Sequence, residues 1–172
     1  MGKKHVPTLV KDERLIKKRR NQIIKSAIQL FKQKGFHRTT TREIAQNAGF
    51  SIGTLYEYIR QKEDILYLVC DSIFDQFRVR MEEALPSHGS SKERLESAIC
   101  AYYKLVDDMQ DEMLVMYQET KSLEKDALKY VLKKEQDFVA IFEPLIRDCV
   151  QENVFQLSEI EIKTYAHNIL VM

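Results

Sequence analysis

Residues 39–66 read TTTREIAQNAGFSIGTLYEYIRQKEDIL, and this stretch decides the fold. Thr40 and Glu43 have the spacing of a capping box, in which the threonine oxygen accepts from the glutamate N–H and the glutamate carboxylate reaches back to the threonine N–H. A short helix is therefore predicted from Thr40 to the break at Gly49. Ser51 is a good N-cap for a second short helix.

The second short helix is expected over residues 51–59, with Ile52, Leu55 and Ile59 turned inward. Small polar side chains and tyrosines occupy its other side. Lys62 then opens a longer helix. A short exposed helix braced by a second one fits the major groove of DNA, so this stretch favours a DNA-binding protein over an enzyme.

The rest of the chain is predicted to be helical as well. Its 172 residues include only 5 Gly and 3 Pro, and apolar residues recur at helical spacing, which favours an all-α fold. The further helices are expected over residues 14–34, 92–109, 111–122, 124–153 and from Ser158 onwards, with a linker at 86–91. The last pattern reaches residue 172 with no stop signal, so the chain is expected to lack its natural C-terminus.

Charge is distributed unevenly along the chain. The first 62 residues contain 15 Lys and Arg against 4 Asp and Glu, a net charge of +11, whereas the remainder carries 12 against 22, a net charge of −10. A basic part that coincides with the helix-turn-helix pattern favours a polyanionic partner. The alternative is a solvated basic helix start at residues 17–20.

Several classes of protein are disfavoured by composition. No apolar run approaches the roughly 20 residues of a membrane span, and the N-terminus lacks the apolar centre of a signal peptide. Cys70, Cys100 and Cys149 are odd in number and set in apolar helical surroundings, which predicts reduced core residues of a cytoplasmic protein. No metal site and no cofactor are expected.

The segment RRNQIIKSAIQLFKQKGFHRTTTREIAQNAGFSIGTLYEYIRQKEDIL resembles the N-terminal domain of the tetracycline-repressor-like (TetR/AcrR) transcription regulators. The specific parts are F-x-x-x-G-F, T-T-x-R-E-I-A-x-x-A-G, and S-x-G-T-L-Y-x-Y followed by K-E-D-I-L. The resemblance covers residues 19–66, about a quarter of the chain. It implies a flexible basic arm at residues 1–13, a DNA-binding domain at 14–62 and a regulatory and dimerisation domain at 63–172.

The same resemblance implies which residues meet double-stranded DNA. They are Thr40, Thr41, Arg42, Ser51, Gly53, Thr54, Tyr56, Tyr58 and Lys62. Gly53 would let the helix approach the DNA closely, and Lys62 would clamp a phosphate. Tyr56 has packing as its alternative role, and Arg42 either a phosphate or a base as its target.

For the body, the resemblance implies a homodimer on a palindromic operator. The candidate part of the dimer seam is the tail with Ile160, Ile162, Tyr165, Ala166, Ile169 and Leu170, and an internal core helix is the alternative role of this tail. The residue types between Tyr102 and Tyr117 indicate an effector pocket, because flexible Met and Tyr side chains suit apolar ligands. The candidate lining residues are Tyr102, Tyr103, Met109, Met113, Met116, Tyr117, Phe138 and Phe142. Core packing is the alternative role of each. An extended apolar molecule of the fatty-acyl type would fit such a lining.

The function expected from these features is a ligand-responsive repressor that a small apolar molecule releases from DNA. An activator of the same fold, or a helical interaction module without DNA binding, are the alternatives. An enzyme is disfavoured because the four histidines are scattered and neither an HExxH pair nor a GxSxG motif occurs.

Overall fold

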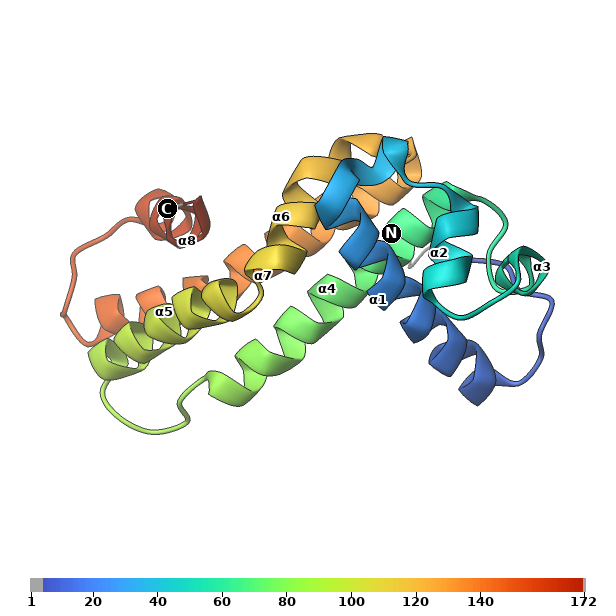
Figure 1. Ribbon diagram of the computed structural model, residues 1–172. Coiled ribbons are helices and arrows are strands. Elements are labelled where there is room, and N and C mark those ends of the chain that lie inside the picture. The colour runs from blue at the N-terminus through green and yellow to red at the C-terminus, as the bar shows by residue number, and fades with distance from the viewer. Residues whose placement is uncertain (1–4, 172) are drawn as a thin grey trace. The chain divides into compact units, whose positions relative to one another are not determined.

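The computed structural model describes residues 5–171, and every regular element in that range is helical (Figure 1). This confirms the all-α prediction. The elements are α1 (Glu13–Arg38), α2 (Thr41–Asn47), α3 (Ile52–Tyr56), α4 (Lys62–Ala84), α5 (Ser91–Asp108), α6 (Gln110–Glu119), the 3₁₀ turn η1 (Thr120–Ser122), α7 (Lys125–Gln151) and α8 (Glu159–Val171). None of these helices is long and apolar enough to cross a membrane.

The helices form two compact units. The first unit contains the chain up to Asp75 together with Gln110–Val131, and the second contains Gln76–Met109 together with the chain from Leu132. Helix α6 thus belongs to the same unit as α1, α2 and α3. We call α1, α2 and α3, with the segments that connect them, the head. The predicted limits at residues 14–62 and 63–172 divide the chain differently and stay a prediction.

The head is built around a small apolar core. Ile23 and Phe31 of α1, Ile44 of α2, and Leu55 and Ile59 of the α3 region are all at most 1% exposed. The predicted end of the first helix at Gly35 is only partly correct. Gly35 has φ of 79° and breaks the helical path, but one more helical turn follows and ends at Arg38. A positive φ favours glycine because it has no Cβ.

Helix α3 is shorter than predicted. It ends at Tyr56, whereas residues up to 59 were expected to be helical. Ile52 was expected to point inward but is 36% exposed, while Tyr58 was expected on the outer face and is only 3% exposed. The chain leaves the helix after Tyr56, so the side chains that follow no longer keep helical periodicity.

Residues 5–12 of the predicted arm contact the head, and the flexibility of the arm stays a prediction. The Leu9 N–H donates to the Glu57 carbonyl at 2.9 Å, and Val6 is 3% exposed. Asp12 then caps α1 by accepting from the N–H groups of residues 14 and 15. Residues 1–4 of the predicted arm lie outside the described residues.

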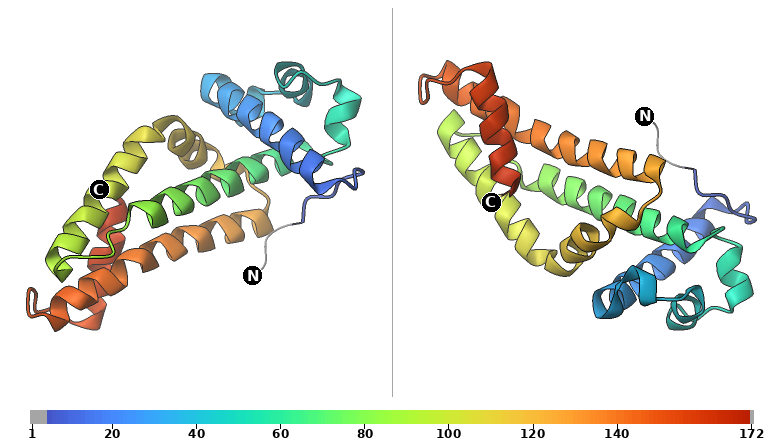
Figure 2. Two further views of the ribbon diagram at one scale, coloured as in Figure 1. Left: turned by 90° about the horizontal axis from the view of Figure 1, so that it is seen from below. Right: turned by 90° about the horizontal axis from the view of Figure 1, so that it is seen from above.

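The second unit contains the later part of α4, α5, the later part of α7, and α8, whose paths can be followed in Figure 2. Capping boxes start two of these helices, Ser90–Glu93 for α5 and Ser158–Glu161 for α8, and Ser158 is the residue where the last helix was predicted to begin. Phe77 lies between Tyr102 and Phe138, with ring centroids 5.7 and 5.0 Å away.

The cysteine prediction is correct for two of three positions. Cys70 and Cys149 are buried and free, but Cys100 is exposed on α5. Within residues 5–171, His, Cys, Asp and Glu do not gather in any group that could hold a metal ion.

Candidate functional site

The N-terminus of α2 is fixed by the predicted capping box. Thr40 Oγ1 accepts from the Glu43 N–H at 3.3 Å, and Glu43 Oε2 accepts from the Thr40 N–H at 2.9 Å. Lys34 Nζ forms an ion pair with Glu43 Oε1 at 2.5 Å. This ion pair and the bonds from Thr40 lower the pKa of Glu43 to about 2. The exposed side chains of Thr40 and Arg42 are therefore attached to a helix N-terminus whose backbone is fixed by the capping hydrogen bonds.

Two pairs of hydroxyl groups lie on the outer sides of α2 and α3, and one of these pairs connects the two helices. Ser51 Oγ caps α3 by accepting from the Thr54 N–H at 3.0 Å, and it lies 3.0 Å from Thr54 Oγ1. Thr41 Oγ1 and the Tyr56 hydroxyl are 3.2 Å apart. Tyr56 is 44% exposed, so its ring is not part of the head's core. Together these groups form a small polar surface that is open to a partner.

Gly53 lies in this polar surface, and the fold itself does not need a glycine there. A Cβ built at Gly53 would meet Ser51 Oγ at 3.7 Å, which is an ordinary van der Waals distance. Glycine inside a helix also lowers stability relative to alanine. The absence of a side chain therefore makes sense if it serves a partner that approaches α3 closely.

Two of the residues predicted to bind DNA, Tyr58 and Lys62, do not lie on this polar surface. Tyr58 was predicted to lie exposed on the recognition helix, but it follows α3 and is buried at 3% exposure. Lys62 was predicted to clamp a phosphate, yet its Nζ donates to the carbonyls of Phe36 and Thr39 at 3.0 and 3.1 Å. It also lies 4.2 Å from the centroid of the Phe36 ring. Lys62 thereby links the end of α1 to the start of α4.

Helix α6 and η1 supply contacts to the head that the sequence did not predict. Glu119 is buried, and its Oε1 accepts from the Phe36 N–H at 3.0 Å beside the break at Gly35. Ser122 Oγ lies 3.0 Å from His37 Nε2. The contact partners are more than 80 residues apart in sequence, so no local pattern points to them.

The residues predicted to line an effector pocket are divided between the two units. Met113, Met116 and Tyr117 belong to the first unit, and the other five belong to the second. Tyr117 is 88% exposed, which contradicts its place in a pocket wall. Tyr102 is 6% exposed, packs on Phe77 and Phe142, and donates to the Leu170 carbonyl at 3.2 Å. Burial raises the pKa of Tyr102 to about 12.

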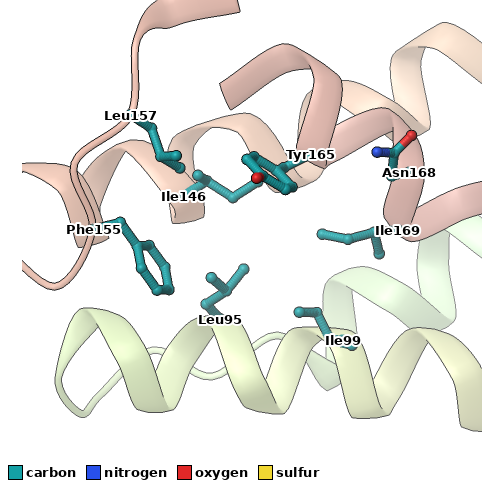
Figure 3. Close-up of a pocket in the computed structure, with 8 residues that line it drawn as sticks. All are labelled: Leu95, Ile99, Ile146, Phe155, Leu157, Tyr165, Asn168 and Ile169. Atoms are coloured by element: carbon teal, nitrogen blue, oxygen red, sulfur yellow. The ribbon is translucent and has the colours of Figure 1, made fainter. Parts of the chain in front are cut away.

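An apolar pocket of about 370 Å³ does occur in the second unit, with a different lining. Figure 3 shows side chains from α5, α7, α8 and the segment between α7 and α8 pointing toward a common space. They are Leu95, Ile99, Ile146, Phe155, Leu157, Tyr165, Asn168 and Ile169. Asn168 is the amide among them. The sequence signal that could have indicated this pocket is the presence of two apolar residues, Phe155 and Leu157, in a segment that was expected to be a loop.

Two family models match the chain. One, described as bacterial regulatory proteins, tetR family, matches residues 23–67, and the other, described as tetracyclin repressor-like, C-terminal domain, matches residues 88–172. The chain belongs to the TetR family. The first match contains α2 and α3 with the hydroxyl contact between them, and the second contains the apolar pocket.

Two bacterial regulators are similar to this chain in sequence. The HTH-type transcriptional regulator HbdR of an Aromatoleum strain is 33% identical over 84% of this chain and 63% of its own length. The fatty acid metabolism regulator protein of Bacillus subtilis is 35% identical over 49% of this chain and 44% of its own length. The chain thus spans less than two thirds of the length of either relative.

A solved structure has the same fold. AibR, in complex with isovaleryl coenzyme A and operator DNA, superposes with a TM-score of 0.75 over 88% of this chain and 82% of that chain. The sequence identity is 20%, so this similarity concerns the fold alone.

Proposed function

We propose that the protein is a ligand-responsive transcription regulator, and specifically a repressor that binds a palindromic operator as a homodimer. The observation that carries the proposal is the exposed polar surface of α2 and α3. At Gly53 in this surface a side chain would fit without a clash inside the protein, so the glycine leaves space for a partner. Membership of the TetR family supports it.

The proposed DNA contacts come from that surface. Arg42 is exposed at the start of α2 and reaches a phosphate or a base edge. Thr54 and Tyr56 contact the DNA from α3, and the hydroxyl bond between Tyr56 and Thr41 sets the direction of the tyrosine ring. Tyr58 is left out of this contact set because it is buried.

The DNA proposal is tested with a duplex that the wild-type chain enriches from a randomised pool. Fluorescence anisotropy then gives the Kd over a series of salt concentrations. Each phosphate neutralised contributes about −0.9 to the slope of log K against log salt.

Arg42→Gln should weaken binding, and it should reduce the magnitude of the slope by about 0.9 if the target of Arg42 is a phosphate. Arg78→Gln is the matched control, because Arg78 is exposed and paired with Glu82 in the second unit. Failure to enrich any duplex would refute the proposal.

We further propose that the apolar pocket of the second unit binds the effector. Its lining fits an aliphatic chain, and Asn168 offers one amide to a polar end. Two similar proteins point to the same class, one named a fatty acid metabolism regulator and one solved with an acyl coenzyme A. By analogy, the effector is a fatty acid or an acyl coenzyme A thioester.

The effector proposal has its own experiment. Fatty acids and acyl coenzyme A thioesters of graded chain length are titrated into the protein–DNA complex. One length class should release the DNA, and Ile99→Trp should abolish the release while leaving DNA affinity intact, because the indole fills the pocket. Leu114→Trp is the control, since Leu114 is 46% exposed on α6 and does not line the pocket. Release that persists in Ile99→Trp would assign the effector to another site.

A further inference from the structure

Helix α3 is too short to be stable without contacts to the rest of the protein. It contains five residues, whereas isolated helices shorter than about 12–15 residues are marginal in water. Its N-terminus is capped by Ser51. Its C-terminal end leaves carbonyl groups that need donors from elsewhere in the protein. The source of those donors determines what holds α3 in its orientation.

The N-terminal segment supplies the first donors. The Glu57 carbonyl, directly after α3, accepts from the Leu9 N–H at 2.9 Å and from the Thr8 hydroxyl at 2.8 Å. Thr8 Oγ1 in turn accepts from the Val10 N–H at 3.2 Å, which fixes the hydroxyl in place. Leu9 has an 82% exposed side chain, so the backbone contact, and not burial of Leu9, holds this part of the segment.

Arg20 of α1 supplies the next donors. Its Nε and Nη2 donate to the Tyr58 carbonyl at 3.2 and 3.1 Å, and Nη2 also donates to the Val6 carbonyl at 2.7 Å. Burial lowers the pKa of Arg20, while Asp64 acts in the opposite direction. A planar guanidinium reaches two carbonyls at once, which an ammonium on a flexible stem does less well.

We propose that Arg20 and residues 6–9 are positioning elements for the recognition helix. In this proposal, which rests on the proposed function, Arg20 acts on operator binding by orienting α3 and not by neutralising a phosphate. The basic character of the first 62 residues alone would suggest the opposite assignment. The geometry favours positioning because the guanidinium donates to internal carbonyls of two segments, Tyr58 after α3 and Val6 and Pro7 of the N-terminal segment.

Two substitutions that leave the net charge unchanged separate these roles. Arg20→Lys keeps the charge and loses the planar fork, and Thr8→Val removes one hydroxyl from a partly exposed side chain. Hydrogen bonds to charged groups contribute more than neutral ones, so Arg20→Lys should weaken binding to the enriched duplex by about 10- to 100-fold and Thr8→Val by about 2- to 10-fold. The salt slope and the affinity for random-sequence duplex should stay at the wild-type values, because no phosphate contact is lost. Circular dichroism at the assay temperature verifies that each variant is folded.

The control variants are Lys18→Gln and Arg20→Gln. Lys18 is exposed on the same helix, so its loss tests what removal of a solvated charge does. Arg20→Lys that binds like wild type, together with Arg20→Gln that has a reduced salt slope, would make Arg20 a phosphate contact and overturn the proposal. Folded Arg20→Lys and Thr8→Val proteins with wild-type affinity would overturn it as well. Should Arg20→Lys not fold, Thr8→Val decides.

Hydrogen exchange distinguishes failure of this proposal from failure of the proposed function. The Leu55 and Tyr58 amides donate within the α3 region, to the Ser51 and Leu55 carbonyls at 3.1 and 3.0 Å. Their protection should fall in Thr8→Val and Arg20→Lys in the absence of DNA. Unchanged protection would refute the positioning role even if wild-type protein binds DNA. Reduced protection in a protein that enriches no duplex would refute the proposed function alone.

Discussion

At the scale of single residues, Gly53 combines a local loss of stability with a benefit for binding. Its Cβ position is open apart from Ser51 Oγ at 3.7 Å, so alanine is compatible with the fold. Gly53→Ala should raise the free energy of unfolding, by up to about 1 kcal/mol, and weaken binding to the enriched duplex. Urea denaturation and anisotropy measure the two effects. A variant that binds DNA as tightly as wild type would show that α3 does not approach the duplex at this point.

Glu43 should make the stability of the head depend on pH. Its pKa is lowered from 4.5 to about 2 by Lys34 and Thr40, so the carboxylate is favoured in the folded state. Its contribution to stability is complete above pH 4.5 and is lost as the pH falls toward 2. Wild type should therefore exceed Glu43→Gln in stability at pH 7, and the difference should shrink below pH 4.5. Urea unfolding at several pH values measures it, and a difference that is equal at pH 7 and pH 3 would contradict the assignment.

Residues whose partners lie within one helical turn could be predicted from the sequence. Thr40 with Glu43 and Ser158 with Glu161 are such pairs, since N-caps act over three residues. Tyr58 was misplaced because its burial depends on where α3 ends.

At the scale of elements, Lys62 connects α1 to α4, and its removal should cost stability. Lys62→Met leaves the Phe36 and Thr39 carbonyls without their charged donor, which should lower the free energy of unfolding by about 1–3 kcal/mol. The salt slope of DNA binding should not change. Lys92→Met is the control, because the exposed pair of Lys92 with Glu96 should contribute well under about 1 kcal/mol. If Lys62→Met reduced the magnitude of the salt slope by about 0.9, Lys62 would contact a phosphate, as the sequence predicted.

Helix starts were predicted better than helix ends. The starts carry local caps, such as Ser51 for α3. The end of α1 depends on a turn at Gly35 that Glu119 supports from α6, and the end of α3 depends on donors from Thr8 and Leu9. Contacts of this kind join segments far apart in sequence, and a single sequence does not reveal them.

At the scale of the whole molecule, α8 offers a surface for the proposed dimer. Of the predicted seam, Ile162, Ala166 and Ile169 are buried within the unit, while Ile160 is 78% and Tyr165 50% exposed. Ile160→Glu should convert dimers into monomers, because a charge in an apolar seam is costly to desolvate. Light scattering after gel filtration measures the mass. Leu9→Glu, at another exposed apolar side chain, should leave it unchanged. Dimers of Ile160→Glu that persist would move the seam elsewhere.

The fold class and the capped start of α2 followed from the sequence, but the pocket did not. Its lining comes from α5, α7, α8 and the segment before α8, and these meet only after folding. Residues Tyr102 to Tyr117 have the composition of a pocket wall, yet they include Tyr117, which is 88% exposed, and Tyr102, which is 6% exposed and packed in the core.

The buried carboxylate of Glu119 also bears on protein engineering. Regulators of this kind invite chimeras, in which residues 1–62 would be grafted onto a foreign sensor. Such a graft would leave the Phe36 amide without its acceptor and His37 without Ser122, at the turn that leads into α2. A transferable cassette from this protein should therefore bring Gln110–Val131 with it, or a foreign sensor should carry a glutamate at the equivalent place.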